Sequence, residues 1–397
     1  PRASYQRGTV DGTPDFIKEL IIQDLSRGGA GVGRDPGGRA VFVHGTAPGD
    51  RVRVRITEEK KRYAQGELLE IIERSPLRVE PKCAVFGPGA GRCGGCQWQH
   101  LPYDLQWKTK VQGALHALAR VGFEAPEGLP REEFSGKSPW AYRNRIQLRG
   151  GAHGVGFYAR GSHEIVPVSR CEIAREEINQ ALPELAREAR ALPAPSKVEI
   201  DVTAEGLTRT AWNARHAALG FRQVNDEQNE RLKAWIRSAL APSLDREGVL
   251  LDLYGGAGNL SLGLAPHFAK IQCVDTGAGK AGELEVPSHF EFHARDVGRW
   301  VQKELKSGAK GLGGGAVILD PPREGAGEAL SGVAELANKF ELRQWIAVGC
   351  DPDSWAKDLW RFLQSEHGKK WRMERLAFFD FFPQTIHLES VALLVRG

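Results

Sequence analysis

Short, almost wholly apolar segments alternate with helical stretches from about residue 226 onward. The segments are VLLDLY (249–254), KIQCVD (270–275), AVILD (316–320), QWIAVGC (344–350) and SVALLVR (390–396). Strands that are apolar on both faces are typical of a parallel sheet with helices covering both sides. The alternation therefore predicts a doubly wound, Rossmann-like α/β domain over residues 226–397.

A different pattern precedes this domain. Over residues 16–75, short apolar runs are separated by turn sequences such as GGAGVGRDPGG and TAPGD, which predicts a small β-barrel of the OB type. The segment RVRVRIT alternates between a face with Val52, Val54 and Ile56 and a face with Arg51, Arg53 and Arg55. The row of guanidiniums suits contact with RNA phosphates, and it suits a solvated strand face equally well.

The other parts of the chain are less regular. Residues 1–15 are expected to be a flexible polar tail, and residues 76–225 to form a central α+β domain. Within that domain, the segment 103–123 carries apolar side chains at helical spacing, which predicts an amphipathic helix. Short strands and one helical insert follow.

Length and composition limit the class of protein. A chain of 397 residues is expected to form two or three domains, and no apolar run is long enough to span a bilayer. We therefore expect a cytoplasmic protein with no membrane contact, and a monomer. The net charge of +4 is compatible with a polyanionic partner without requiring one.

In the reducing cytoplasm, clustered cysteines are expected to be metal ligands or reactive thiols before disulfides. Three of the six cysteines lie close together as Cys83, Cys93 and Cys96, and Cys171 follows at a distance. Four thiolates suit a zinc ion or an iron-sulfur cluster. A thioredoxin-like pair at Cys93 and Cys96 is the rival interpretation, although the strand-to-helix context it needs is missing.

The segment VLLDLYGGAGNLSLGLA, 249–265, has the order strand, glycine turn, helix. Its glycines at 255, 256 and 258 allow a ligand to approach the backbone amides at the start of the helix. Asp275 ends the next strand, where its carboxylate can bind both hydroxyls of a ribose, and Asp296 would close the adenine side. The pattern indicates a nucleoside cofactor, and a dinucleotide fits it too.

Several motifs in one order resemble the RNA 5-methyluridine methyltransferase family. They are FRQVN (221–225), DPPREG (320–325), Cys350 and DFFPQTIHLE (380–389). The four cysteines resemble the [4Fe-4S] site of the members that modify 23S rRNA, and residues 16–52 resemble the TRAM domain that those members carry. The resemblance covers nearly the whole chain. It implies a Rossmann-like methyltransferase domain, an N-terminal OB-fold TRAM barrel and a central α+β iron-sulfur domain.

The resemblance also implies the chemistry and its residues. Cys350 is expected to add to C6 of uracil, and Glu389 to remove the C5 proton. Asp320 is expected between cofactor and base. Residues implied to line the S-adenosylmethionine site are Gln223, Tyr254, Gly256, Gly258, Asn259, Asp275, Asp296 and Asp320. Arg323 is expected to favour the thiolate and contact RNA, and Phe221 to stack on a base, although a buried aromatic residue is common at such a position.

One departure from the family pattern bears on the nucleophile. Asp351 follows Cys350 where the family usually has asparagine, and a carboxylate there should raise the thiol pKa unless it is paired. We therefore expect a uridine-C5 methyltransferase acting on structured RNA, with 23S rRNA as the substrate. The alternatives are a tRNA methyltransferase, an RNA-binding homologue with impaired catalysis and, less favoured, a disulfide reductase.

Overall fold

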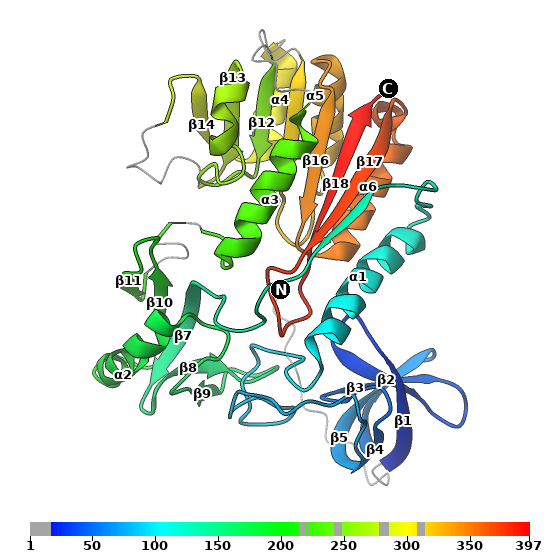
Figure 1. Ribbon diagram of the computed structural model, residues 1–397, viewed down its shortest axis with the longest axis vertical. Helices are drawn as coiled ribbons and strands as arrows, with labels where there is room; N and C mark the ends of the chain where they lie inside the picture. The colour runs from blue at the N-terminus through cyan, green and yellow to red at the C-terminus, as the bar shows by residue number, and fades with distance from the viewer. Residues whose placement is uncertain (1–16, 215–218, 221, 242–247, 278–285, 308–313) are drawn as a thin grey trace.

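The computed structural model describes residues 17–214, 219–220, 222–241, 248–277, 286–307 and 314–397. The tail expected at residues 1–15 lies outside this part of the chain. The described residues form a closed five-stranded barrel, a five-stranded sheet and an eight-stranded sheet. The carboxyl ends of the parallel strands in the largest sheet point toward the two smaller bodies (Figure 1).

The barrel contains the first five strands of the chain, in the spatial order β1-β2-β3-β5-β4. They are β1 (Ile17–Leu25), β2 (Ala30–Arg34), β3 (Ala40–His44), β4 (Arg51–Glu59) and β5 (Tyr63–Glu73). The alternation predicted for β4 is confirmed, because Val52 and Val54 are fully buried inside the barrel while Arg51 is exposed. The apolar interior closes the sheet on itself and leaves the charged faces outside.

The central five-stranded sheet has the order β11-β10-β7-β8-β9 and is covered by one helix. Its strands are β7 (Arg145–Gly151), β8 (Gly154–Tyr158), β9 (Ile165–Pro167), β10 (Ser196–Val202) and β11 (Thr208–Trp212). Helix α2 (Glu176–Arg190) buries Ile178, Leu182 and Leu185 against this sheet. The predicted helical insert among short strands is therefore confirmed.

The largest sheet has the order β14-β13-β12-β15-β16-β18-β17-β6. Its C-terminal strands are β12 (Val249–Leu253), β13 (Lys270–Asp275), β14 (Phe290–Ala294), β15 (Gly315–Leu319), β16 (Gln344–Gly349), β17 (Trp371–Phe379) and β18 (Glu389–Arg396). The first five in spatial order are parallel, and β18 runs antiparallel to β16 and β17. We refer to it as the catalytic sheet. It confirms the predicted doubly wound arrangement.

Helices cover both faces of the catalytic sheet. One face packs against α4 (Val297–Ser307), α5 (Ala329–Lys339) and α6 (Pro352–Gln364), and the other against α3 (Asp226–Ala239) and the 3-10 helix η2 (Leu262–His267). A second 3-10 segment, η3 (Glu366–Gly368), follows α6. The helix predicted after the glycine turn is present as η2, a short 3-10 helix that contains Pro266.

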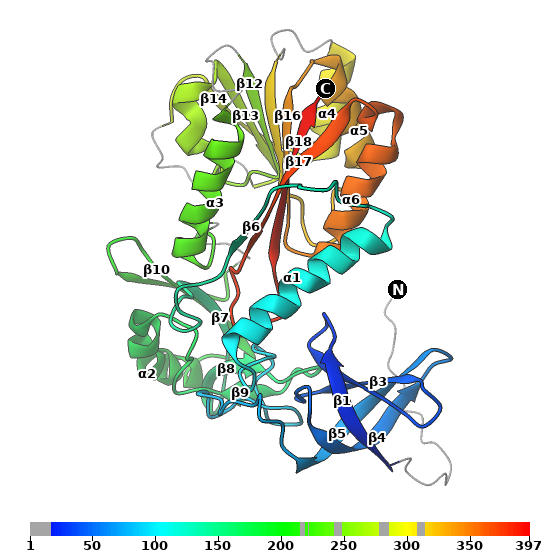
Figure 2. The ribbon, with the colours of Figure 1, turned by 45° about the vertical axis from the view of Figure 1, so that its right-hand side comes forward.

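Two elements from the segment expected to form the central domain belong to the catalytic domain instead, one in its sheet and one packed on its helices. Strand β6 (Arg131–Phe134) pairs with β17 in parallel, and helix α1 (Tyr103–Arg120) packs on α6. Figure 2 shows α1 running from the smaller bodies to α6. The amphipathic pattern predicted for α1 is confirmed, with Val111 and Leu118 buried in the same core as the sheet. The central segment therefore ties the parts of the molecule together.

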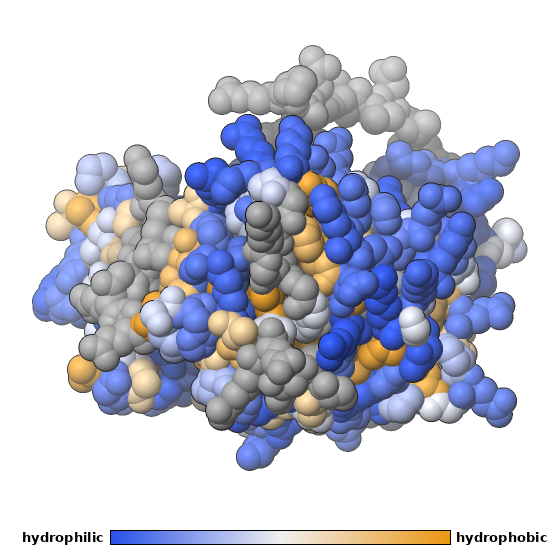
Figure 3. All heavy atoms as spheres, turned by 90° about the horizontal axis from the view of Figure 1, so that it is seen from above, coloured by the Kyte–Doolittle hydropathy of each residue, from blue (hydrophilic) through white to orange (hydrophobic). Residues whose placement is uncertain are grey.

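The end of the catalytic sheet opposite the barrel presents a mainly hydrophilic surface, with apolar groups in narrow stretches between polar ones (Figure 3). Among the described residues, no helix is long and apolar enough to cross a membrane.

Candidate active site

Three of the predicted site residues meet at the carboxyl edge of the catalytic sheet. Asp320 follows β15, whose last residue lies opposite Ala347 of β16. Cys350 follows β16, and Gly349 pairs with Ser390 of the antiparallel strand β18. Glu389 begins β18, so the strand register brings it to the same edge. A thiol and two carboxyl groups that are far apart in sequence are thus brought together.

Burial and neighbouring charges raise the pKa values of all three groups. Burial raises the pKa of the Cys350 thiol to about 12, and the charges of Glu389 and Asp320 add to this, while Arg323 opposes it. Burial and Asp320 raise the pKa of Glu389 well above its usual value. Burial and the carboxylate of Asp252 raise the pKa of half-buried Asp320 to about 7. Arg323 is therefore the nearby cation that favours the thiolate.

Asp351 does not act as a free charge beside the thiol. It is the N-cap of α6 and accepts hydrogen bonds from the backbone amides of Asp353, at 3.0 Å, and Ser354, at 3.1 Å. Its carboxylate also pairs with Arg27 of the barrel at 3.3 Å. Burial opposes ionisation of Asp351, but the Ser354 amide and Arg27 hold its pKa below the usual value. The pairing that the sequence left open is thus present.

The neighbouring residue Gly349 is required by close packing. A Cβ atom at this position would stand 2.7 Å from Cβ of Trp355. The indole of Trp355 is buried and donates a hydrogen bond of 3.1 Å to the carbonyl of Ala347. A glycine before the nucleophile therefore goes together with a large side chain on α6.

The glycine turn lies one strand away from these residues. Tyr254, directly after β12, has a φ of +63°, which is unusual for a residue other than glycine and marks a strained turn. Gly256 and Gly258 also have positive φ, and a Cβ at Gly258 would stand 2.9 Å from the ring of Phe290. The positive φ angles, and at Gly258 the close contact with Phe290, account for the glycines of this turn.

Two carboxylates flank the turn. Asp275 ends β13 and accepts a hydrogen bond of 2.6 Å from the amide of Gly277. Asp296 precedes α4 and accepts 2.9 Å from the amide of Arg299. Tyr254 and Asp296 line a cavity of about 970 Å³ together with α4 and α5. Carboxylates after β13 and β14 fit a ribose and a base, so these residues suit a nucleoside cofactor.

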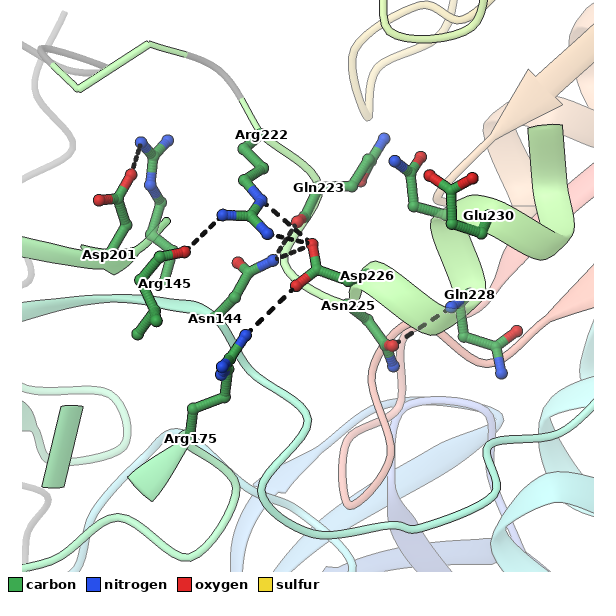
Figure 4. Close-up of polar contacts among 12 residues, drawn as sticks. Asn144, Arg145, Arg175, Asp201, Arg222, Gln223, Asn225, Asp226, Gln228 and Glu230 are labelled. Atoms are coloured by element: carbon green, nitrogen blue, oxygen red, sulfur yellow. Dashed lines mark hydrogen bonds and ion pairs between the residues drawn. The ribbon is translucent and has the colours of Figure 1, made fainter. Parts of the chain in front are cut away.

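Asn259 and Gln223, both expected to line the cofactor site, differ in their contacts with the protein. The side chains of Asn259 and Asn229 exchange two hydrogen bonds, of 2.8 and 3.0 Å, which tie the glycine turn to α3. The backbone carbonyl of Gln223 accepts 2.9 Å from Asn144. Figure 4 shows the Gln223 side chain pointing away from the polar contacts around Asp226. Its amide is therefore available to a ligand, whereas that of Asn259 already has a protein partner.

The connection into α3 is held by the carboxylate of Asp226. It accepts hydrogen bonds of 2.7 Å from both Asn144 and Arg222 (Figure 4). Asn144 is fully buried. The sequence did not single it out, because its contact with the segment FRQVN is visible only in the folded protein. Phe221, the predicted stacking residue, lies outside the described residues.

The four cysteines of the central domain lie near one another. Burial raises the pKa of Cys93 to about 11 and that of Cys96 to about 12, and the other thiols of the set add to both shifts. Cys171 and Cys83 belong to the same set, because each acts on the other thiols. Within the described part of the chain, however, no group of three or more potential ligands is arranged so that it could hold a metal ion.

The predicted RNA-contact arginines already have carboxylate partners. On the outer face of the barrel, Arg51 and Arg53 share Glu19, and each has a second glutamate beside it. Arg55 pairs with Glu67 at 3.3 Å. Phosphate contact at these positions would therefore compete with exposed ion pairs. Arg323 is exposed near the site, with one guanidinium nitrogen 3.5 Å from the His387 ring.

The sequence matches two protein families and several full-length relatives. The TRAM domain family matches residues 17–69, and the tRNA (Uracil-5-)-methyltransferase family matches residues 307–397. An uncharacterized RNA methyltransferase of Bdellovibrio bacteriovorus is 33% identical, over 98% of each chain. A 23S rRNA (uracil(1939)-C(5))-methyltransferase of Dichelobacter nodosus is also 33% identical, over 95% of this chain and 98% of the relative.

A solved structure has the same fold over nearly the whole chain. It is the Pyrococcus abyssi tRNA (uracil-54, C5)-methyltransferase in complex with S-adenosyl-L-homocysteine, with a TM-score of 0.68 and 21% identity, covering 95% of this chain and 99% of that one. The fold, the TRAM barrel and the full-length relatives agree. The chain belongs to the RNA uracil-C5 methyltransferase family.

Proposed function

We propose that this protein transfers a methyl group from S-adenosylmethionine to C5 of a uridine in 23S rRNA, with Cys350 as the nucleophile. The observation that carries the proposal is the meeting of Cys350, Glu389 and Asp320 at the carboxyl edge of the catalytic sheet, next to the glycine turn. The relatives from Dichelobacter nodosus and Chromohalobacter salexigens, which are named as 23S rRNA methyltransferases, support the choice of RNA.

The chemistry needs a thiolate because C5 of uracil is a weak nucleophile. The Cys350 sulfur adds to C6 of the ring, which becomes an enolate with electron density at C5. When bound, S-adenosylmethionine supplies an electrophilic methyl group. Glu389 then takes the C5 proton, the bond between C6 and sulfur breaks, and the sulfur leaves as a thiolate.

The electrostatics of the site define what each residue must do. Negative charge on Glu389 or Asp320 disfavours the thiolate, and Arg323 offsets part of this effect. The buried Glu389 carboxyl has a raised pKa, which suits a group that accepts a proton late in the reaction. Asp320, with a pKa of about 7, can donate or accept a hydrogen bond at the uracil.

The residues around the glycine turn would hold the cofactor. Asp275 would bind the ribose, Tyr254 and Asp296 would bind on the adenine side, and Gln223 would make the remaining polar contacts; the support is their position near the turn and, for Tyr254 and Asp296, their shared cavity. The positive φ angles of Gly256 and Gly258 fix the course of the turn beside these residues. These assignments rest on position and chemistry together.

We further propose that Cys83, Cys93, Cys96 and Cys171 hold a [4Fe-4S] cluster. The support is the donor set, since four cysteine thiolates are the usual ligands of such a cluster, and the other thiols of this set act on the pKa values of Cys93 and Cys96. The amide of Gly95 already donates to the Cys93 sulfur at 3.4 Å, a contact typical of cluster sites. None of the steps above depends on the cluster.

The decisive experiment measures transfer of tritiated methyl groups to unmodified 23S rRNA and, in parallel, to tRNA. Wild-type protein should label the ribosomal RNA, and Cys350→Ala should abolish labelling. Lys357→Ala changes an exposed position on α6, the helix that follows Cys350, and should leave the rate unchanged. Labelling that survives loss of the thiol would exclude the mechanism, and labelling of tRNA alone would move the substrate to tRNA.

A 5-fluorouridine RNA provides an independent check. Because fluorine cannot leave as a proton, the protein should remain covalently attached to this RNA through Cys350. A gel shift that resists denaturation would show the adduct. Binding of the RNA without any adduct would favour an RNA-binding homologue with impaired catalysis.

A further inference from the structure

The turn that joins β1 and β2 of the barrel reaches the catalytic edge. It comprises residues 26–29, and its conformation is closed by a hydrogen bond from the Ser26 amide to the Ala30 carbonyl. The buried indole of Trp98 donates 3.3 Å to the carbonyl of Gly29. A Cβ at Gly29 would stand 2.7 Å from Ile386, in the segment that leads to Glu389. The tip of the barrel is thus packed against the segment that precedes Glu389.

Arg27 extends from the same turn to the segment that follows Cys350. Its guanidinium pairs with Asp351 at 3.3 Å and also with Asp353, at the start of α6. The stem of Arg27 lies against Gly113 of α1, where a Cβ would stand 3.1 Å from its Cγ. A glycine in the middle of α1 therefore leaves the path open along which the side chain reaches α6.

Two carboxylates lie at the start of α6. Asp351 follows Cys350 directly and Asp353 comes two residues later, and a negative charge is favourable at a helix N-terminus. The charge of Asp351 is nevertheless unfavourable for a thiolate at the adjacent residue. Arg120 of α1 pairs with Asp353 only, which leaves Arg27 as the cation that contacts Asp351 among the described residues.

We propose that Arg27 is a positioning residue for the nucleophile: by binding Asp351 and Asp353, it docks the TRAM barrel on the helix that follows Cys350 and compensates the negative charge next to the thiol. The inference rests on the proposed role of Cys350. It makes the barrel part of the catalytic centre as well as a module for binding RNA.

The compensation acts within a defined set of charges. Those facing the thiol or Asp351 are Glu389, Asp320, Arg323, His387, Arg27, Asp353 and, through Asp353, Arg120. Without Arg27, Asp351 keeps its cap hydrogen bonds and so stays beside the thiol with its charge uncompensated. The thiolate becomes less favourable. Asparagine at 351 would keep the cap and remove the charge.

The test measures the rate at which iodoacetamide alkylates Cys350 between pH 7 and 10, by mass spectrometry of the peptide that carries it. Arg27→Gln should slow alkylation about three-fold at pH 8, as expected for a thiol pKa raised by about half a unit. Arg27→Gln combined with Asp351→Asn should return to the rate of Asp351→Asn alone. Arg120→Gln, which removes a similar charge that does not contact Asp351, should react like the wild type.

The same variants separate this inference from the proposed function. Methyl transfer by Arg27→Gln should show a lower kcat with its pH profile shifted upward, and Arg27→Lys should restore most of the rate. An unchanged alkylation profile together with a raised KM for RNA would overturn the inference and make Arg27 a phosphate contact. If wild-type protein transferred no methyl group, or Cys350→Ala stayed active, the proposed function itself would fail.

Discussion

Cys350 shows how strongly the environment decides what a side chain does. In sequence it is a single cysteine between glycine and aspartate, and most free thiols are simply buried. The fold surrounds it with two carboxyl groups and one arginine, and burial raises its pKa to about 12. The charges around this thiol therefore help to decide how readily it ionises.

Glu389→Gln separates the addition step from the elimination step. The amide cannot accept the C5 proton, so turnover should fall by about 10²–10⁴-fold. Loss of the carboxylate also removes the main charge that raises the Cys350 pKa, so the thiol should titrate at lower pH and the rate of its alkylation should rise. A covalent complex with ordinary RNA should accumulate, as seen on denaturing gels.

Glu324, an exposed glutamate next to Arg323 in sequence, offers a control for this variant. Glu324→Gln should keep full turnover and form no stable complex with RNA. Unimpaired turnover by Glu389→Gln would assign the base to another residue.

Among the elements, α1 determines where the segment between β17 and β18 lies. Lys110 of α1 pairs with Asp380 at 2.7 Å, and both side chains are completely buried. Tyr103 donates 2.8 Å to the same carboxylate, and Lys110 also donates 2.9 Å to the carbonyl of Phe382. Because Glu389 directly follows this segment, a helix from the middle of the chain sets the approach to the proposed base.

Lys110→Met tests this pair. It leaves the Asp380 charge buried without its partner and should lower the free energy of unfolding by about 3–5 kcal/mol. Urea denaturation followed by tryptophan fluorescence would measure the loss. Lys110→Met combined with Asp380→Leu should recover part of it, because no buried charge then remains unpaired.

Arg120→Met removes an exposed ion pair on the same helix and should leave the urea midpoint nearly unchanged. Equal effects of Arg120→Met and Lys110→Met would mean that the buried pair is not what holds the segment.

At the scale of the whole molecule, three bodies meet at one edge of the catalytic sheet. The barrel reaches it through Arg27, and the central segment through α1 and β6. Three of the set, Cys83, Cys93 and Cys96, lie in a loop that packs on β8, where the Gly94 amide donates 3.0 Å to the carbonyl of Tyr158. Cys171 lies after β9. A cluster there would brace the central sheet while standing apart from the steps at Cys350.

Anaerobic purification tests the cluster. The protein should be brown and contain about four iron atoms per chain, as a [4Fe-4S] cluster requires. Cys171→Ser should lose the iron and its visible absorbance. Cys350→Ser changes a cysteine outside the set and should retain both. Stoichiometric zinc in place of iron would refute the assignment.

Much of the architecture could be predicted from local patterns. The alternation in β4, the apolar strands of the catalytic sheet and the face of α1 depend on residues close in sequence, and the structure confirms them. The helix after the glycine turn was also predicted, but its 3-10 form was not, and Pro266 within it lacks a backbone donor.

The sequence by itself determined the fold class, and through its ordered motifs it indicated which thiol and which carboxyl groups to expect at the active site. Only the tertiary structure decided that Arg27 pairs with Asp351, that Asn229 holds Asn259 and that β6 joins the catalytic sheet. The reason is physical: periodicity records which face of a strand or helix is buried, whereas the partner of a charge or of a sheet edge depends on how distant segments pack.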